Sequence, residues 1–318
     1  MPNDFNVNSK TSRYDYQFDP NGESTAAQVC RIAGSGRRVL ELGCAAGAMS
    51  AVLVSHYGCE VTGVEYDATA AEQARRFCQR VVLGNLDQPD WHEAFAGMQF
   101  DTILAADVLE HLRDPLTCLR QARKLLAQDG QLVVSVPNIA HSGVVAALLI
   151  NDFPYRETGL LDRTHIHFFT ALTLGQTLVQ AGFSVEAVRT VDTGPWHPEF
   201  KHHWDALPAA IRDWLAANPA GKAFQIIMLA RPQDEPAAYG DPSGDATQRW
   251  LAQPSQAATL EAELAALRQS QQSLNQALAD MRAERDQAQA NLAVIHTSRS
   301  WRLTAPIRRL SRMLRSSK

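Results

Sequence analysis

The sequence predicts an α/β fold with a mainly parallel sheet of seven strands, in which the last strand runs antiparallel to a neighbour. Strand and helix signals alternate over residues 37–231, the order typical of a parallel sheet covered by helices. Between 190 and 224 the chain has room for one helix, over 209–218, which favours a returning hairpin at the end of the sheet. With 318 residues, 45% of them hydrophobic, the chain suits one large domain with additional segments.

Apolar runs bounded by turn residues define the expected strands. They are residues 38–42, 60–65, 80–83, 100–105, 131–136, 183–190 and 224–230. Helices are expected between the strands. The first begins in the glycine-rich turn after residue 42 and ends near Gly58. The second begins at Thr69, where Glu72 would complete a capping box.

Two later helices have clear boundary signals. One has Asp114 as its N-cap and Pro115 at its first position, and it ends before Gly130. The other follows Thr170 and ends before Gly182.

The chain divides into an N-terminal segment, the α/β domain, a linker, a heptad segment and a basic tail. These parts span residues 1–36, 37–231, 232–256, 257–297 and 298–318. No secretory signal is visible at the start, and the longest apolar run, residues 144–150, is too short to cross a bilayer. The five cysteines are odd in number and lack Cys-x-x-Cys spacing, which indicates free thiols in a reducing cytosol.

The heptad segment predicts a C-terminal coiled-coil helix, because its apolar residues recur at alternating intervals of four and three. The seam positions are Leu260, Leu264, Leu267, Gln271, Leu274, Leu278, Met281, Arg285, Ala288, Leu292 and Ile295. The polar groups of Gln271 and Arg285 lower the stability of such a seam and can fix its register. We expect a homo-oligomer through 257–297; the alternative is a single amphipathic helix lying on the α/β domain.

The tail has a charge opposite to that of the remaining chain. Its last twenty residues contain seven basic residues and no acidic one, whereas residues 1–298 carry 23 basic and 34 acidic residues. If a helix begins at Pro306, Ile307, Leu310 and Leu314 share one face, the arginines cover the other, and Trp301 precedes the helix. This composition favours a helix lying in an anionic membrane surface; the alternative is a solvated end that frays.

A glycine-rich turn follows the first expected strand, in the sequence Glu41-Leu-Gly-Cys-Ala-Ala-Gly47. Gly43 allows a sharp turn and a close approach to a ligand, and the next helix offers free N–H groups at its N-terminus. The second strand ends in Glu65, 22 residues after Gly43. A carboxylate at this position takes both hydroxyls of a ribose, so the two elements together predict a nucleoside-containing cofactor.

Two alanines in this turn help to choose the cofactor. A dinucleotide needs a glycine-rich helix start for its pyrophosphate, but Ala45 and Ala46 replace the intervening glycine. S-adenosylmethionine carries a positive sulfonium and no phosphate, so its binding requires only a turn of complementary shape and hydrogen bonds. We expect Ala45 to adopt an ordinary negative φ at little cost.

Four matches in order make residues 37–231 resemble the class I S-adenosylmethionine-dependent methyltransferases. Glu41-Leu-Gly43-x-x-x-Gly47 resembles their glycine motif and Glu65 their ribose-binding acid, and Gly84-Asn-Leu-Asp87 lies where the family has its adenine loop. Residues 100–115, followed by 126–138, resemble the fourth-strand signature and the strand after it.

The resemblance implies a Rossmann-like sheet and S-adenosyl-L-methionine as the cofactor. The cofactor-binding residues that it implies are Glu41, Gly43, Ala45, Gly47, Glu65, Asn85, Leu86, Asp87 and Asp107. The sequence departs from the family at Ala45, where glycine is usual, and at Asn85, where aspartate is common. The carbonyl oxygen of Asn85 can still accept a hydrogen bond from the adenine amino group, so we expect a weakened or re-aimed contact.

The segment Leu161-Asp-Arg-Thr-His-Ile-His-Phe-Phe-Thr170 resembles the Thr-His segment that covers the acceptor site in related enzymes. Methyl transfer to a hydroxyl is an in-line displacement in which a base removes the hydroxyl proton, and histidine titrates in the useful range. His165 is the first candidate, with His167, His111 and Asp107 as secondary ones. Alternatively His165 caps or packs a loop, and positioning of the two substrates is sufficient.

A second histidine-rich stretch spans residues 196–205. The spacing of His197, His202 and His203 matches no zinc pattern, so we expect no metal here and a solvated insert that lines the acceptor pocket. Its aromatic residues suit either stacking on a sugar or ring face or ordinary packing: Trp196, Phe200 and Trp204.

Three functions agree with these patterns. The first is O-methylation of a sugar hydroxyl in O-antigen or capsule assembly, because the sequence from Ser298 to Pro306 resembles tails of enzymes in such pathways. The protein would then be cytoplasmic and peripheral at the inner face of the membrane. The second is methylation of a small lipophilic acceptor, such as a quinone precursor; the third is a non-catalytic scaffold. Nucleic acid is not an expected partner, because residues 1–298 are acidic.

Overall fold

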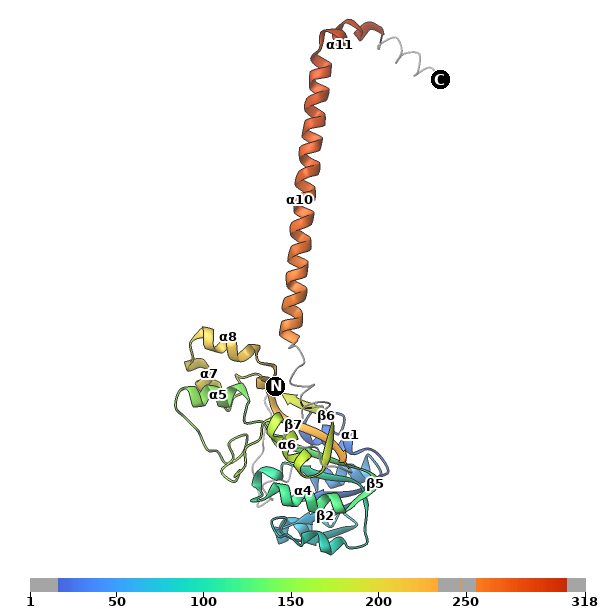
Figure 1. Cartoon of the computed structure of the whole chain (residues 1–318), viewed down its shortest axis with the longest axis vertical. Helices are drawn as coiled ribbons and strands as arrows, with labels where there is room; N and C mark the ends of the chain where they lie inside the picture. Colours follow the sequence, from blue (N-terminus) through green and yellow to red (C-terminus); the bar gives the residue numbers. More distant parts are fainter. Residues whose placement is uncertain (1–16, 234–246, 248–255, 308–318) are drawn as a thin grey trace. The chain divides into compact units, whose positions relative to one another are not determined.

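The computed structural model describes residues 17–233, 247 and 256–307. Two compact units divide the chain, one ending at Ser255 and the other beginning at Gln256. The first contains a seven-stranded sheet in the order β3-β2-β1-β4-β5-β7-β6 (Figure 1). Its strands are β1 (Arg38–Leu42), β2 (Glu60–Glu65), β3 (Arg80–Leu83), β4 (Phe100–Ala106), β5 (Leu126–Pro137), β6 (Phe183–Asp192) and β7 (Ala223–Pro232).

The strand directions agree with the sequence prediction. β1 pairs in parallel with β2 and β4, β2 with β3, and β4 with β5. β7 lies between β5 and β6 and is antiparallel to both. A mainly parallel Rossmann-like sheet with an antiparallel last strand is therefore confirmed. β5 begins five residues earlier than predicted, because Leu126 pairs with Phe100 before a shift of register.

Helices cover both faces of the sheet. The covering helices are α1 (Thr25–Ala33), α2 (Ala48–Ser55), α3 (Ala68–Ala74), α4 (Pro115–Lys124) and α6 (Ala171–Gln180). The same unit contains α5 (Ser142–Leu149), α7 (Lys201–Ala206) and α8 (Ala209–Ala217), whose apolar residues form separate clusters. Successive strand residues point to opposite faces, so Val39 packs in the core formed with α1, α2 and α3. Leu40 packs in the other core, which contains residues of α4 and α6.

Helix starts follow local capping chemistry. Asp114 accepts a hydrogen bond from the Thr117 amide, and Thr170 forms a capping box with Thr173, so both predicted N-caps are confirmed. The start predicted at Thr69 is wrong: α3 begins at Ala68 because Asp67 accepts from the Ala70 amide.

Three helices of the first unit have no counterpart in the sequence prediction. α1 lies in the predicted N-terminal segment 1–36, and its buried residues join the sheet core. α5 and α7 pack near each other, and smaller apolar clusters outside the main cores contain Val144, Phe200 and Trp204.

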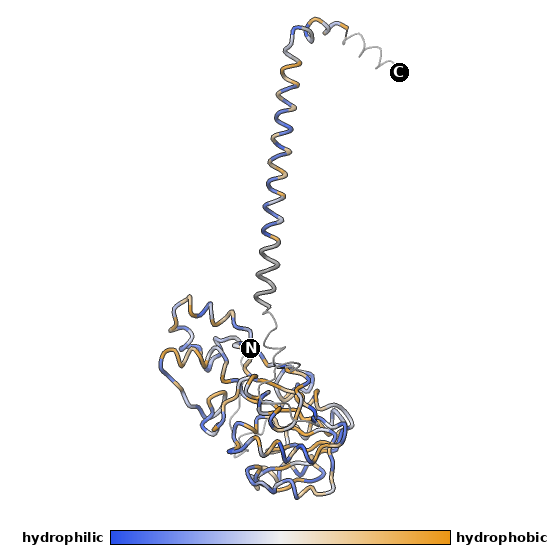
Figure 2. The backbone as a smooth tube through the Cα atoms, viewed as in Figure 1, coloured by the Kyte–Doolittle hydropathy of each residue, from blue (hydrophilic) through white to orange (hydrophobic). Residues whose placement is uncertain are grey.

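The second unit contains α10 (Gln256–Thr297) and α11 (Arg299–Leu303). Apolar positions recur along the described part of α10 (Figure 2) and are exposed, among them Leu267, Leu274, Leu278, Met281, Leu292 and Ile295. The helix agrees with the heptad pattern, and its pairing with a second copy stays a prediction. Trp301 lies inside α11, and it also precedes the helical residues 305–307, which agree with the helix start predicted at Pro306.

The predicted linker and the end of the tail, including Leu310 and Leu314, lie largely outside the described residues. Within the described part of the chain, no helix has the length and apolar character needed to span a membrane.

Candidate active site

The turn between β1 and α2 has three residues in the left-handed region: Gly43, Ala45 and Gly47, with φ of 67°, 47° and 87°. A Cβ atom at Gly43 would lie 2.9 Å from a methyl group of Val108, and one at Gly47 would lie 3.0 Å from Cα of Ala74. The glycines are therefore required by conformation and by space. The expected negative φ of Ala45 is wrong, and its conformation costs about 1–2 kcal/mol.

Glu65 fixes this turn. Its Oε2 accepts a hydrogen bond from the Ala45 amide at 2.9 Å, which accounts for the left-handed alanine. Its Oε1 accepts from the amides of Tyr66 and Asp67 at 3.0 and 2.9 Å. Since a carboxylate offers about four lone-pair positions, about one is left for a ligand hydroxyl. The side chain that was predicted to bind a ribose therefore also ties β2 to the glycine turn.

Glu41 lies beneath the turn and is 2% exposed. Ser50 of α2 donates a hydrogen bond to its Oε2. Burial raises the pKa of Glu41 to about 8, and the Ser50 hydrogen bond opposes this change. Glu41 thus supports the turn from the protein interior.

The loop after β3 contains the predicted adenine-contacting residues. Asn85 Oδ1 accepts from the Asp87 amide at 2.9 Å, and Asp87 Oδ1 accepts from the Arg113 amide at 2.7 Å. Leu86 packs in the core. The Asn85 oxygen is therefore engaged in the loop and has one lone pair left for a ligand.

Tyr66 is a residue that the sequence reasoning missed. It directly follows Glu65 and is 79% exposed. An exposed aromatic ring beside Glu65, the predicted ribose-binding carboxylate, suits stacking on an adenine. Its position one residue after Glu65 was the available signal.

Asp107 follows β4 with a φ of 53°. Its amide donates to the Ser135 carbonyl, and Ser135 Oγ donates to its Oδ1 at 3.1 Å. The residue is exposed although protein surrounds the carboxyl group on most sides, and this desolvation raises the pKa of Asp107 to about 6.

The carboxyl ends of the parallel strands form a strongly acidic edge. Residues 43–47, 65–67, 84–87 and 107–110 contain no Lys or Arg and five acidic residues: Glu65, Asp67, Asp87, Asp107 and Glu110. Ligands of open α/β sheets bind at this edge. It would repel a pyrophosphate, whereas a cofactor with a sulfonium and an ammonium group fits it.

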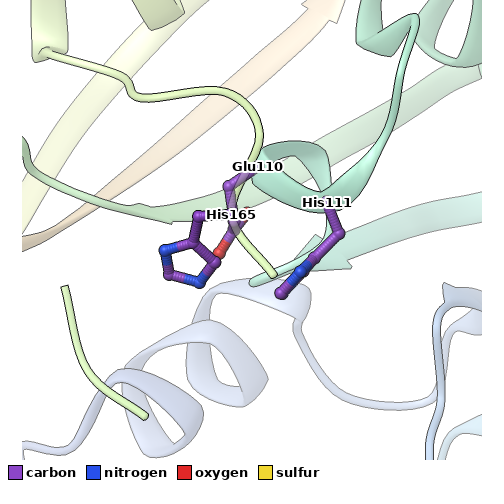
Figure 3. A group of neighbouring side chains, drawn as sticks. All are labelled: Glu110, His111 and His165. Atoms are coloured by element: carbon purple, nitrogen blue, oxygen red, sulfur yellow. The ribbon is translucent and has the colours of Figure 1, made fainter. Parts of the chain in front are cut away.

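Two of the three predicted catalytic histidines come together next to this edge (Figure 3). The ring centroids of His111 and His165 are 4.8 Å apart, and His165 is 8% exposed. The amides of Ile166 and His167 both donate to the Glu110 carbonyl, which holds the 160–170 segment against η2 (Leu109–His111). His167 lies apart, with Nε2 3.2 Å from the Arg113 carbonyl oxygen.

The stretch 196–205 is only partly a solvated insert. Phe200, His203 and Trp204 are buried, whereas Trp196 is 61% exposed. His203 Nε2 lies 2.7 Å from an Asp152 carboxylate oxygen. Among its aromatic residues, Trp196 is thus the one available for stacking on a ligand.

The fold and the site together define an α/β protein that binds a nucleoside-containing ligand at the carboxyl ends of its strands. Residues 19–188 match the family described as "Methyltransferase domain", and the chain belongs to this family.

Individual proteins that the chain resembles are also described as methyltransferases. The chain is 28% identical over 192 residues to a ubiquinone biosynthesis O-methyltransferase of Psychrobacter arcticus, covering 58% of this chain and 72% of the relative. It is 30% identical to a "probable S-adenosylmethionine-dependent methyltransferase" of Mycolicibacterium smegmatis, over 63% and 74% of the two chains. Among solved structures, a magnesium protoporphyrin IX methyltransferase of Synechocystis is 16% identical, with a TM-score of 0.45 over 65% of this chain and 82% of that one.

Proposed function

We propose that this protein is an S-adenosylmethionine-dependent O-methyltransferase. S-adenosylmethionine is the cofactor, and it supplies an electrophilic methyl group on a sulfonium. The observation that carries this proposal is the hydrogen bond from the Ala45 amide to Glu65. Through it a buried carboxylate holds the left-handed Ala45 of the glycine turn at the acidic edge of the sheet.

Each part of the edge has a role toward the cofactor in this proposal. Glu65 accepts a ribose hydroxyl, and Tyr66 with residues 85–87 surrounds the adenine. The turn 43–47 lies against the amino-acid part, with Glu41 as its support. Asp107 is the carboxylate for the ammonium group, because it is exposed and negatively charged above its pKa of about 6.

A sugar hydroxyl of a cell-surface glycan is the first acceptor that we propose. Its support comes from the C-terminal sequence, where a heptad helix is followed by an arginine-rich segment with Trp301. Oligomers that present several weak membrane-binding tails would bind an anionic inner-membrane surface more tightly than one chain. Lipid-linked glycans would then lie close to the active site.

A lipophilic phenol is the second acceptor, and two observations favour it. Relatives are described as ubiquinone biosynthesis O-methyltransferases. In addition, the rings of His165, Phe168, Phe153 and Tyr155 follow one another at centroid distances of 6.5, 5.7 and 5.1 Å. Tyr155 is 51% exposed, so this aromatic series leads from the candidate acceptor site to the surface.

Calorimetric titration of S-adenosylhomocysteine into the full chain tests the cofactor assignment. We expect micromolar binding, weakened by about 1–3 kcal/mol in Glu65→Ala through loss of a charged acceptor. Glu60→Ala is the matched control, because Glu60 lies exposed at the opposite end of β2. Circular dichroism is used to check that both variants fold.

The acceptor is tested by methyl transfer to a lipid-free oligosaccharide and to a simple catechol. Transfer to one of them alone identifies the acceptor class. If the folded wild-type chain does not bind S-adenosylhomocysteine, the proposed function is wrong, and the scaffold hypothesis takes its place.

A further inference from the structure

Glu110, His111 and His165, here called the Glu110 cluster, have the composition of a metal site (Figure 3). One potential ligand atom from each residue lies within 4.8 Å of the other two. Glu110 is 1% exposed and His165 is 8% exposed. Neither carboxylate oxygen of Glu110 has a hydrogen-bond partner among the residues that the structure describes, although both are buried. A buried carboxylate without hydrogen bonds is costly unless a cation compensates it.

The histidines are oriented as metal ligands usually are. His165 Nδ1 lies 3.1 Å from the Leu160 carbonyl oxygen, and His111 Nδ1 lies 3.2 Å from the Thr164 carbonyl oxygen. A carbonyl oxygen can only accept, so the hydrogen of each neutral ring is on Nδ1 and the lone pair is on Nε2. Backbone carbonyls that fix the non-ligating nitrogen are typical of metal-binding histidines.

The local electrostatics also favour a cation. The acidic side chains of Asp107 and Asp162 lie close enough to Glu110 to act on it electrostatically. Asp162 itself is 3% exposed, and its Oδ1 accepts from the amide and the hydroxyl of Thr164. Two acidic residues outside the cluster therefore add negative charge near a site that a divalent cation would neutralise.

We propose that the Glu110 cluster binds a divalent transition-metal cation, which in turn binds the acceptor hydroxyl. Two histidines and one carboxylate are a ligand set for Zn²⁺ or Fe²⁺ that leaves a position open. Ligand atoms around a tetrahedral ion lie about 3.3–3.5 Å apart. Small side-chain rotations would therefore bring the ligand atoms of the Glu110 cluster to the distances that an ion requires.

This inference rests on the proposed function for its catalytic role. A metal-bound hydroxyl is more acidic, so its proton passes to solvent and the oxygen attacks the methyl carbon of S-adenosylmethionine. The O–C bond forms as the C–S bond breaks, and the electron pair of that bond stays on sulfur to give S-adenosylhomocysteine. His165 then acts as a ligand and not as the base.

A second group of possible ligands, Asp152, His202 and His203, provides the matched control. It differs from the Glu110 cluster because Asp152 and His202 are exposed, and because His203 is already engaged with Asp152. Its contact between His203 and Asp152 is therefore already made without a metal.

Titration of Co²⁺ into the metal-free full chain, followed by visible absorption, tests the proposal. We expect one tightly bound equivalent, displaced by Zn²⁺, with affinity reduced at least about 100-fold in Glu110→Gln and His165→Gln and unchanged in His202→Gln. A thermal unfolding temperature that Zn²⁺ raises in the wild type and not in the two ligand variants supports the same site. Circular dichroism shows whether the variants fold, and the wild-type titration is decisive if they do not.

The outcomes separate this inference from the proposed function. Binding of S-adenosylhomocysteine without saturable metal binding, or full methyl transfer in the presence of a chelator, overturns the metal site and leaves the methyltransferase. Equal metal affinity in the wild type and both folded ligand variants also overturns it. Metal binding without binding of S-adenosylhomocysteine supports the site and contradicts the proposed function.

Discussion

Replacement of Glu41 by glutamine should remove a pH dependence from the stability of the α/β domain. Glu41 is buried beneath the glycine turn, and its pKa rises from 4.5 to about 8 on folding. Between these values the folded state binds one more proton than the unfolded state, so stability falls as pH rises. Above pH 8 this contribution is fully lost, and below pH 4.5 it is fully present.

The size of the effect follows from the two pKa values. Between pH 6 and pH 8, titration of Glu41 lowers the free energy of unfolding by about 2 kcal/mol, since one pKa unit corresponds to about 1.4 kcal/mol. Glutamine has the shape of the protonated carboxyl group and keeps an oxygen that accepts from Ser50 Oγ. Glu41→Gln should therefore gain about 2 kcal/mol over the wild type across this interval.

Urea unfolding of both proteins at several pH values measures this difference. Asp107 and Glu110, whose pKa values are also raised, contribute equally to both proteins and cancel in the comparison. Parallel curves for the wild type and Glu41→Gln would refute the reasoning, because Glu41 would then titrate alike in the folded and unfolded chains.

Three other changes have defined expected outcomes. Ala45→Gly removes the strain of the left-handed alanine but adds the conformational entropy of glycine to the unfolded chain, so the free energy of unfolding in urea should rise by up to about 1 kcal/mol. A lower free energy of unfolding in this variant would show that the conformation of Ala45 is not strained. Gly143→Ala places a Cβ atom 2.7–2.8 Å from Phe200, so thermal unfolding should show a loss of about 1–3 kcal/mol, and an unchanged midpoint would contradict this packing. In sedimentation velocity, Leu278→Asp should dissociate the oligomer expected from α10, whereas Gln276→Asp should not; identical sedimentation of the two variants would argue against the heptad seam.

The central strands were predictable because each is a short apolar run that ends at a turn residue. β1, β2 and β3 coincide with the predicted ranges. α5 was not predicted, because its nearly continuous apolar sequence lacks a helical period, and it packs in an apolar cluster outside the main cores. The start of α3 was misplaced because Asp67, which directly follows β2, reaches the Ala70 amide before Thr69 can act as a cap.

The candidate cofactor residues were accessible from the sequence because they occupy fixed positions after successive strands. The hydrogen bond from the Ala45 amide to Glu65 was not, since it depends on backbone angles that only the folded turn defines. The Glu110 cluster was missed for a different reason. Its histidines were considered as bases one at a time, and only the fold brings His165 next to His111.

The position of β7 has a consequence for the order in which the protein is made. β6 leaves the ribosome before β7, yet in the native sheet β6 pairs with β7 and not with β5. Until residues 223–232 are available, β5 has an open edge and β6 has no partner strand, and such edges favour association between chains. A nascent chain halted after α8 would therefore expose the unpaired edges of β5 and β6. Synthesis of β7 would cover both edges.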